Sequence, residues 1–148
     1  MDFNAFISEK KDKQIIFFDG ICVLCNSFVS FVLRKDKKHS FLFAPRQGKL
    51  FEKFQWLMSP EAKIADSIVL CRYNAKKHTW EFFIESQAVV EILKSLTGFY
   101  LLGLLLSFFP TSFLNKLYRL IAKNRYKLFG KEKNCRFLNQ EERKYFFD

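Results

Sequence analysis

The chain has 148 residues, of which 49% are hydrophobic and 18% aromatic, and its formal net charge is +10 at pH 7. This length predicts one domain, residues 1–148, that buries a core without disulfide crosslinks, and the apolar content excludes a disordered chain. No nucleic-acid-binding motif accompanies the basic charge, so we expect a solvated basic surface and no nucleic-acid partner.

The first predicted elements alternate between strand and helix. Gln14–Phe18 is a short apolar run typical of a buried strand. Residues 22–35 follow as a helix, because apolar side chains recur there at helical spacing: Leu24, Phe28, Phe31 and Val32. A second strand is predicted at Phe41–Phe43, ended by Pro45, and a second helix at 47–57.

The next elements are predicted to be a hairpin and a third helix. Strands at 67–71 and 79–84 are joined by a turn, and Ser86 is a suitable N-cap for the helix that follows. The buried stripe of that helix is expected at Val89, Ile92, Leu93 and Leu96. The order β-α-β-α-β-β-α is that of a thioredoxin-like α/β core, at about 14–97, and a C-terminal helical extension covers about 98–148.

Two further helices are predicted in the extension. Residues 99–109 are almost wholly apolar and end at Pro110, but so short a helix covers only about half of a ~30 Å hydrocarbon core. Residues 112–127 are amphipathic and rich in Lys and Arg. We expect a helical hairpin packed on the core, and peripheral membrane contact stays open as the alternative. The inward side chains would be Leu102, Leu105, Leu106, Phe113, Leu117, Leu120 and Ile121.

The most informative motif is Asp19–Cys25, which places two cysteines where the first strand gives way to the first helix. Unpaired N–H groups and the helix dipole favour a thiolate there, so the motif predicts a dithiol redox site that needs no cofactor and no metal. Cys22, nearer the helix start and expected to be more exposed, is the predicted nucleophile. Cys25, one turn later and expected to be more buried, would resolve the mixed disulfide.

The remaining sequence features leave several alternatives open. The N-terminus lacks the features of a signal peptide, so we expect a cytoplasmic protein, where a CxxC beside a βα unit is catalytic or metal-binding. Cys71 is predicted to lie in the core, and Cys135 to be a surface thiol or a third redox cysteine. A haloacid dehalogenase-type phosphatase is excluded because Phe17 stands where its nucleophilic aspartate would be. A non-catalytic interaction module with a vestigial or metal-binding CxxC remains the rival reading.

The chain resembles the DCC family of bacterial thiol–disulfide oxidoreductases. Asp19, Cys22 and Cys25 match the aspartate and two cysteines of the family name, and Asn124–Gly130, with Cys135 beyond, is similar to its C-terminal signature. Other similar segments are 41–44, 66–70 and 86–88, so the resemblance covers about residues 14–137. It implies a thioredoxin-like fold and a protein-disulfide oxidoreductase that acts on protein or small-molecule disulfides and is served by a reductase.

The resemblance also suggests which residues surround the dithiol. Asn124, Arg125 and Tyr126 would wall the site, with Arg125 either supplying positive charge to it or anchoring the last helix. Asp19 would cap the first helix or orient a water for proton transfer to Cys25. Ordinary thioredoxins carry a cis-proline before the third strand, whereas this chain has Ala65–Ser67 there. The thioredoxin groove therefore does not transfer to this chain.

Overall fold

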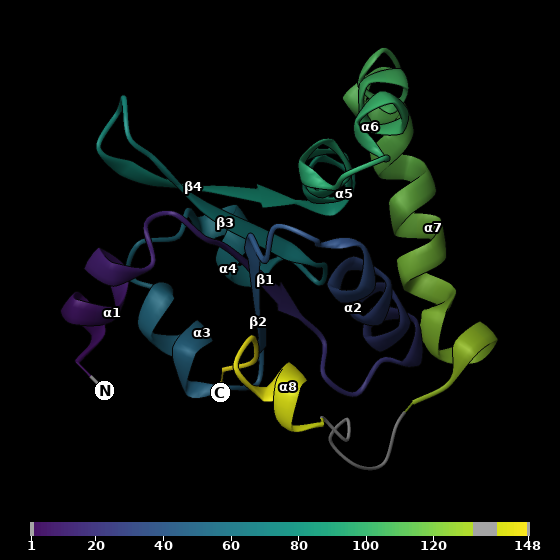
Figure 1. The fold of residues 1–148 in the computed structure, drawn as a ribbon. Coiled ribbons are helices and arrows are strands. Elements are labelled where there is room, and N and C mark those ends of the chain that lie inside the picture. Colours follow the sequence, from purple (N-terminus) through teal and green to yellow (C-terminus); the bar gives the residue numbers. More distant parts are fainter. Residues whose placement is uncertain (1, 132–138, 148) are drawn as a thin grey trace.

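A computed structural model describes residues 2–131 and 139–147 and shows a four-stranded mixed sheet of order β2-β1-β3-β4 (Figure 1). Strand β1 (Gln14–Phe18) pairs in parallel with β2 (Phe41–Pro45) and antiparallel with β3 (Val69–Asn74). Strand β4 (Thr79–Ile84) closes the sheet as the antiparallel partner of β3. This topology confirms the predicted thioredoxin-like fold, with the carboxyl end of β1 at the centre of the sheet.

Eight helices surround the described sheet, and three of them were not predicted: α1 (Phe3–Glu9), α4 (Pro60–Ile64) and α8 (Gln140–Arg143). Each is short, so its hydrophobic period is too brief to stand out in the sequence. The other helices are α2 (Val23–Lys35), α3 (Lys49–Phe54), α5 (Glu85–Ser95), α6 (Tyr100–Ser107) and α7 (Thr111–Phe129). Helix α3 is shorter than the predicted 47–57.

Both faces of the sheet are covered by helices, and β1 shows how the residues divide. Ile15 and Phe17 point into a cluster shared with α1, α3 and α4. Ile16 and Phe18 point into a second cluster, shared with α2 and α5. All four side chains are almost fully buried because β1 lies inside the sheet and has helices on either side.

The last residues of the chain return to the free edge of β2. The Phe43 N–H donates to the Tyr145 carbonyl, and the Phe147 N–H donates to the Phe43 carbonyl, both at 2.8 Å. The rings of Phe43 and Phe146 stack with centroids 5.1 Å apart. The C-terminal end of the chain therefore takes the place of an additional edge strand.

Helix α5 begins earlier than predicted. Its N-cap is Ile84, whose side chain makes no capping bond, so the N-cap role predicted for Ser86 is wrong. The Ser86 hydroxyl instead hydrogen-bonds the Asn115 amide oxygen of α7. The partner of Ser86 comes from a helix far along the chain, and the local sequence around Ser86 does not reveal this contact.

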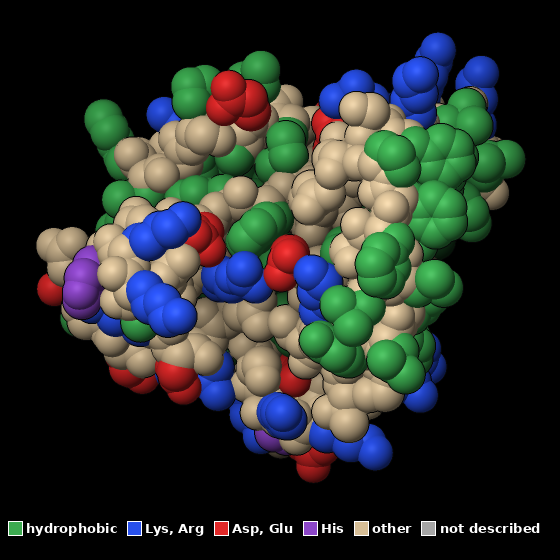
Figure 2. All heavy atoms as spheres, turned by 90° about the horizontal axis from the view of Figure 1, so that it is seen from above, with side chains coloured by type: hydrophobic (Ala, Val, Ile, Leu, Met, Phe, Trp, Pro, Cys, Tyr) green, Lys and Arg blue, Asp and Glu red, His purple; other side chains and the backbone are tan. Residues whose placement is uncertain are grey.

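Helices α6 and α7 form a corner instead of the predicted antiparallel hairpin. Helices α6 and α7 meet at a bend of 111°, and most of the side chains predicted to point inward are exposed to solvent. Hydrophobic side chains gather on the right-hand side of Figure 2, over α6 and α7. The exposed members of the predicted set are Leu102, Leu105, Phe113, Leu117, Leu120 and Ile121. No single described helix is long and apolar enough to cross a membrane, although the bent pair of α6 and α7 together reaches that length and composition.

Helix α6 is held on α5 through a close approach at Gly103. A Cβ atom built there would lie 2.8 Å from Lys94 Cγ, 2.9 Å from Lys94 N and 3.2 Å from the Val90 carbonyl oxygen. Two of these three atoms belong to the backbone of α5, so they cannot move aside as a flexible side chain would. The contact between the two helices therefore requires glycine at this position.

We expect Gly103→Ala to destabilise the fold, although alanine favours a helix over glycine by about 1 kcal/mol. The clash with the α5 backbone should outweigh that gain and lower the free energy of unfolding by about 1–3 kcal/mol, measured by urea denaturation. Leu101→Ala, at an exposed position of the same helix, is the control and should change it by no more than about 0.5 kcal/mol. A Gly103→Ala protein as stable as the original would show that α6 does not need this close contact.

Candidate active site

The two cysteines of the motif lie where β1 passes into α2. Cys22 is the N-cap of α2, and its Sγ accepts a hydrogen bond from the Cys25 N–H at 3.3 Å. Asn26 holds the preceding loop, because its Nδ2 donates to the carbonyls of Gly20 at 2.9 Å and Cys22 at 3.0 Å. The Cys22 sulfur thus occupies the position that a serine or aspartate oxygen takes in an ordinary N-cap, where negative charge is stabilised.

The exposure of the cysteines is the reverse of the prediction. Cys22 is completely buried, whereas Cys25 is half-buried. The cause is the segment after α7: Lys131 forms a β-bridge with Cys22, and the Val23 N–H donates to the Gly130 carbonyl at 3.4 Å. A contact made by residues so far along the chain covers the helix start, where local sequence alone predicts an exposed thiol.

The Cys25 thiol is held in its protonated form. Burial raises its pKa to about 12, helped by its hydrogen bond to Cys22 and by the charge of Cys22 and Asp19, while the charge of Arg125 opposes the rise. The thiol that is more accessible is therefore a poor nucleophile in the resting dithiol.

Asp19 joins the motif to the last long helix. Its Oδ1 accepts hydrogen bonds from the Ile21 N–H at 3.2 Å and Gln47 Nε2 at 2.8 Å, and its Oδ2 accepts one from the Tyr126 hydroxyl. Burial alone would raise the pKa of Asp19, but these hydrogen bonds and the charge of Arg125 outweigh it and lower the pKa. Asp19 is therefore an anion that fixes the loop, and the capping role considered for it is filled by Cys22.

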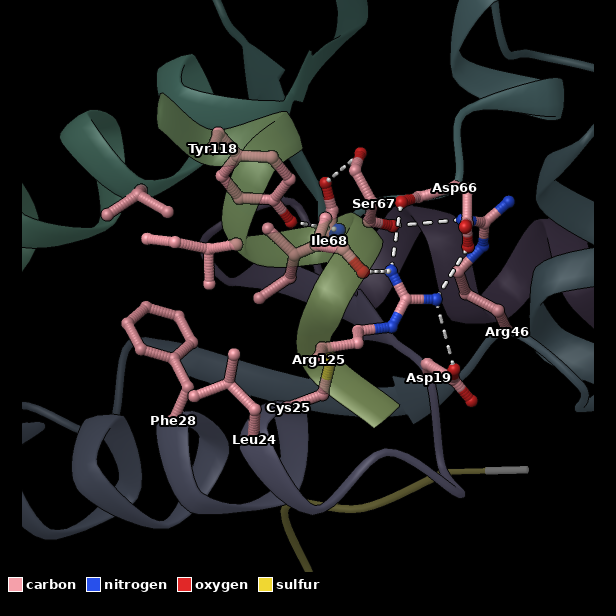
Figure 3. A pocket seen from close by; sticks show the side chains of 13 residues that line it. Asp19, Leu24, Cys25, Phe28, Arg46, Asp66, Ser67, Ile68, Tyr118 and Arg125 are labelled. Carbon is pink, nitrogen blue, oxygen red and sulfur yellow. Dashed lines mark hydrogen bonds and ion pairs between the residues drawn. The ribbon is translucent and has the colours of Figure 1, made fainter. Parts of the chain in front are cut away.

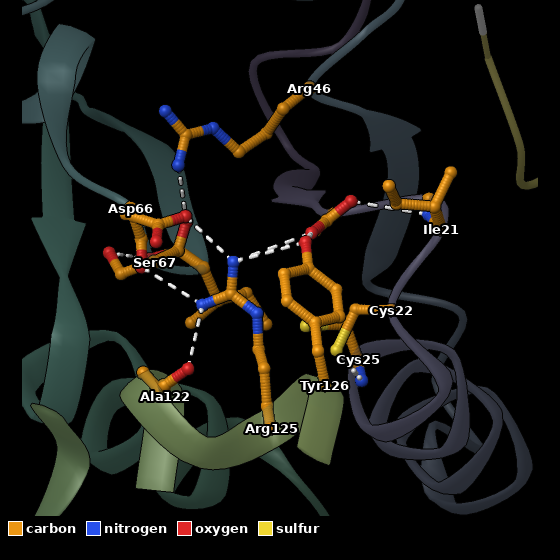
Figure 4. Close-up of polar contacts among 12 residues, drawn as sticks. Ile21, Cys22, Cys25, Arg46, Asp66, Ser67, Ala122, Arg125 and Tyr126 are labelled. Atoms are coloured by element: carbon orange, nitrogen blue, oxygen red, sulfur yellow. Dashed lines mark hydrogen bonds and ion pairs between the residues drawn. The ribbon is translucent and has the colours of Figure 1, made fainter. Parts of the chain in front are cut away.

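Arg125 is a buried cation between two carboxylates (Figure 4). Its Nη2 lies 2.7 Å from Asp66 Oδ1 and 3.4 Å from Asp19 Oδ2. Burial would lower its pKa, but the hydrogen bonds to Asp66 and Tyr126 more than compensate and raise it. The two readings of Arg125 are thus compatible, because one guanidinium both anchors α7 and places positive charge near Cys25.

Arg46 belongs to the same group of side chains and was missed by the sequence analysis. Its guanidinium donates to the backbone carbonyls of Ala65 and Ser67, the latter at 3.0 Å, and so holds the segment before β3. One signal was present: Arg46 directly follows β2, and the carboxyl ends of parallel strands meet at one edge of a sheet. The segment it holds occupies the place of the thioredoxin cis-proline, and the described residues contain no cis peptide bond.

A mostly apolar pocket of about 280 Å³ opens beside Cys25 (Figure 3). Its polar end is formed by Asp19, Arg46, Asp66 and Arg125, the same side chains that fix the loop and the segment before β3. Its apolar walls come from three helices and the start of β3: Leu24, Phe28, Ile68, Val89, Tyr118, Ile121 and Ala122. The pocket thus offers an apolar surface that leads to a thiol.

The other predicted residues do not reach the dithiol in the described structure. Asn124 donates to the Leu120 carbonyl within α7 at 2.8 Å. Cys71 is buried in β3, and burial raises its pKa well above the ordinary value. Cys135 lies outside the described residues. Within residues 2–131 and 139–147, no group of three or more His, Cys, Asp or Glu side chains is placed to hold a metal ion.

Comparisons with known proteins agree with this geometry. The model of a family described as DCC1-like thiol-disulfide oxidoreductase matches residues 16–131. A chloroplastic DCC family protein of Arabidopsis thaliana is 32% identical over 133 residues, which cover 89% of this chain and 73% of the relative. The uncharacterized protein YuxK of Bacillus subtilis is 27% identical over 139 residues, 94% of this chain and 97% of the relative. No solved structure matches the chain.

Removal of the Arg125 charge and removal of the Asp19 charge should change the reactivity of Cys25 in opposite directions. Arg125→Ala removes the charge that lowers the pKa of Cys25, so Cys25 should be alkylated several-fold more slowly at a fixed pH. Asp19→Asn removes a charge that raises this pKa, so alkylation should be faster. Iodoacetamide rates against pH, measured in a Cys22→Ser background, isolate the one thiol.

The matched control for these variants is Lys123→Ala, which removes an exposed cation of α7 that lines neither the pocket nor the loop. Its alkylation rate should equal that of the background protein. A change of the same sign in the Arg125 and Asp19 variants, or an equal change in the control, would contradict a local electrostatic effect.

Proposed function

We propose that this chain, which belongs to the DCC1-like thiol-disulfide oxidoreductase family, reduces disulfides through its CxxC dithiol, with Cys22 as nucleophile and Cys25 as resolving cysteine. The observation that carries the proposal is the N-cap geometry, in which Cys22 Sγ receives the Cys25 N–H at the start of α2. A sulfur at a helix N-cap faces the positive end of the helix dipole. The raised pKa of Cys25 keeps that thiol protonated until it resolves the mixed disulfide, which is the role proposed for it.

In the first step, the Cys22 thiolate attacks one sulfur of a substrate disulfide. The substrate S–S bond breaks, a mixed disulfide forms on Cys22, and the other substrate sulfur leaves as a thiolate that takes a proton from solvent.

In the second step, Cys25 loses its proton and attacks the Cys22 sulfur. Formation of the mixed disulfide removes the Cys22 charge that helped to raise the pKa of Cys25, while the lowering effect of Arg125 remains. The resolving thiol thus becomes more acidic when it is needed. A Cys22–Cys25 disulfide forms, the second substrate thiolate leaves and is protonated, and the substrate has gained two electrons and two protons.

The oxidised enzyme then needs two electrons from a dithiol reductase, and we propose the cytoplasm as the compartment that supplies them. The cover over Cys22 adds a requirement, because Gly130 and Lys131 must move aside before a substrate sulfur reaches Cys22 Sγ. Among the described residues, the contacts that would have to open include one β-bridge, one hydrogen bond of 3.4 Å, and the Lys131 ammonium 4.5 Å from the centroid of the Tyr126 ring.

Trapping of the mixed disulfide tests the assignment of roles. Cys25→Ser should accumulate a covalent adduct with a disulfide-bonded peptide, because the adduct on Cys22 cannot be resolved, whereas Cys22→Ser should accumulate none. Non-reducing mass spectrometry measures both, and Cys71→Ser is the control, expected to turn over like the original protein. Adducts on Cys22→Ser alone would exchange the two roles, and no adduct or turnover in any variant would favour a non-catalytic interaction module.

The apolar pocket beside Cys25 suggests which disulfides are preferred. We propose that it takes an apolar side chain next to the substrate half-cystine, since its walls are almost wholly apolar. Burial of one such side chain contributes roughly 1.5–3 kcal/mol, enough for a tenfold or greater preference.

A polar substitution in the pocket wall should therefore lower activity selectively. With Val89→Gln, kcat/KM for a disulfide peptide carrying Leu beside cysteine should fall about tenfold, and that for the same peptide carrying Asn should change little. The ratio of the two values is insensitive to a general loss of folded protein. An unchanged ratio would show that the pocket does not select the substrate.

A further inference from the structure

Helices α6 and α7 expose an apolar face that the dithiol chemistry does not use. We define this apolar face by four strongly exposed side chains on the two helices and at the corner between them. Phe108 is 84% exposed, Leu101 77%, Leu120 60% and Leu105 58%. Figure 2 shows hydrophobic side chains crowded on this side of the molecule, with Lys and Arg at the edges. Contiguous apolar surface of this kind marks an interaction site in most proteins.

Helix α7 contributes a regular stripe to this face. Phe113, Leu117 and Leu120 recur at the spacing of one helix side, and all three are exposed. A second side of the same helix, which carries Leu114 and Arg125, is buried against the domain. The helix therefore exposes an apolar side that is separate from the side packed on the domain.

Basic side chains border the stripe. Lys116, Lys123 and Lys127 are exposed on α7 and form no ion pair with any carboxylate in the part of the chain that the structure describes. The sequence contains no Asp or Glu between Glu91 and Glu132, a stretch that includes all of α6 and α7. The segment that forms the apolar face thus carries positive charge only, and one of its cations, Arg119, pairs with Glu85 of α5.

We propose that the apolar face docks on the surface of an anionic lipid bilayer. A helix with large apolar side chains on one side and lysines beside them lies in the interface plane, where the apolar groups enter the acyl boundary and the lysines meet lipid phosphates. The bend of 111° suits two helices lying on the membrane, with exposed Phe108 at the corner as the group that enters most deeply.

Charge argues against the other occupants of such a face. A second copy of this chain would bring the same lysines to the contact and add repulsion, and each copy carries a net charge of +10. An ordinary protein partner would need to supply both an apolar groove and a dense acidic rim. An anionic bilayer offers both properties without further assumptions.

Flotation of the full-length protein with vesicles tests this proposal. We expect binding to phosphatidylcholine vesicles that contain phosphatidylglycerol, and none to pure phosphatidylcholine. Binding should weaken strongly at 1 M salt, where the screening length falls to about 3 Å. Leu101→Gln/Phe108→Gln and Lys116→Gln/Lys123→Gln should each weaken binding at least about tenfold.

Matched controls lie elsewhere on the surface. Trp56→Gln removes an apolar side chain that is 90% exposed, and Lys37→Gln/Lys38→Gln removes two exposed lysines; neither should alter binding. The proposal is overturned if anionic vesicles are not bound, or if the controls lose as much binding as the test variants. It is equally overturned if sedimentation shows a dimer that Leu101→Gln/Phe108→Gln dissociates, because the face would then be an interface between copies. Circular dichroism of each variant establishes that it is folded.

Discussion

The carboxylate of Asp19 connects the loop before α2 to α7 and to the loop after β2, and the rest of the site depends on these connections. It receives the Tyr126 hydroxyl and the Arg125 guanidinium from α7, and Gln47 from the loop after β2. Arg125 continues the connection to Asp66, just before β3. Without this anion, the buried guanidinium would keep only Asp66 as a carboxylate partner, and α7 would lose the contacts that connect it to the loop before α2.

The two cysteines of the motif differ in how accessible their sulfur atoms are. Cys22 is buried beside Gly130 and Lys131, while Cys25 faces the pocket with its pKa raised to about 12. The more accessible sulfur, that of Cys25, is therefore protonated, and a protonated thiol reacts with oxidants more slowly than a thiolate.

Sequence reasoning succeeded where the signal was local. The apolar run of β1, the helical spacing of α2 and the hairpin of β3 and β4 specify the core of the fold, and the motif itself places the two sulfurs. It failed where contacts between distant residues decide. Lys131 pairs with the buried Cys22, and the role of Arg46 depends on strands that meet only in the folded chain. For α7, periodicity correctly identified an apolar side but could not reveal that a different side packs on the domain.

The return of residues 145–147 to β2 has a consequence for association between chains. An uncovered β2 would present the N–H and C=O of Phe43 as a template for a strand from another chain, and its sequence, Phe-Leu-Phe-Ala, is strongly apolar. Residues 145–147 occupy those two groups and so cover this edge of the sheet. A protein shortened by these few residues would keep its dithiol and its helices, yet would gain an edge able to recruit its neighbours.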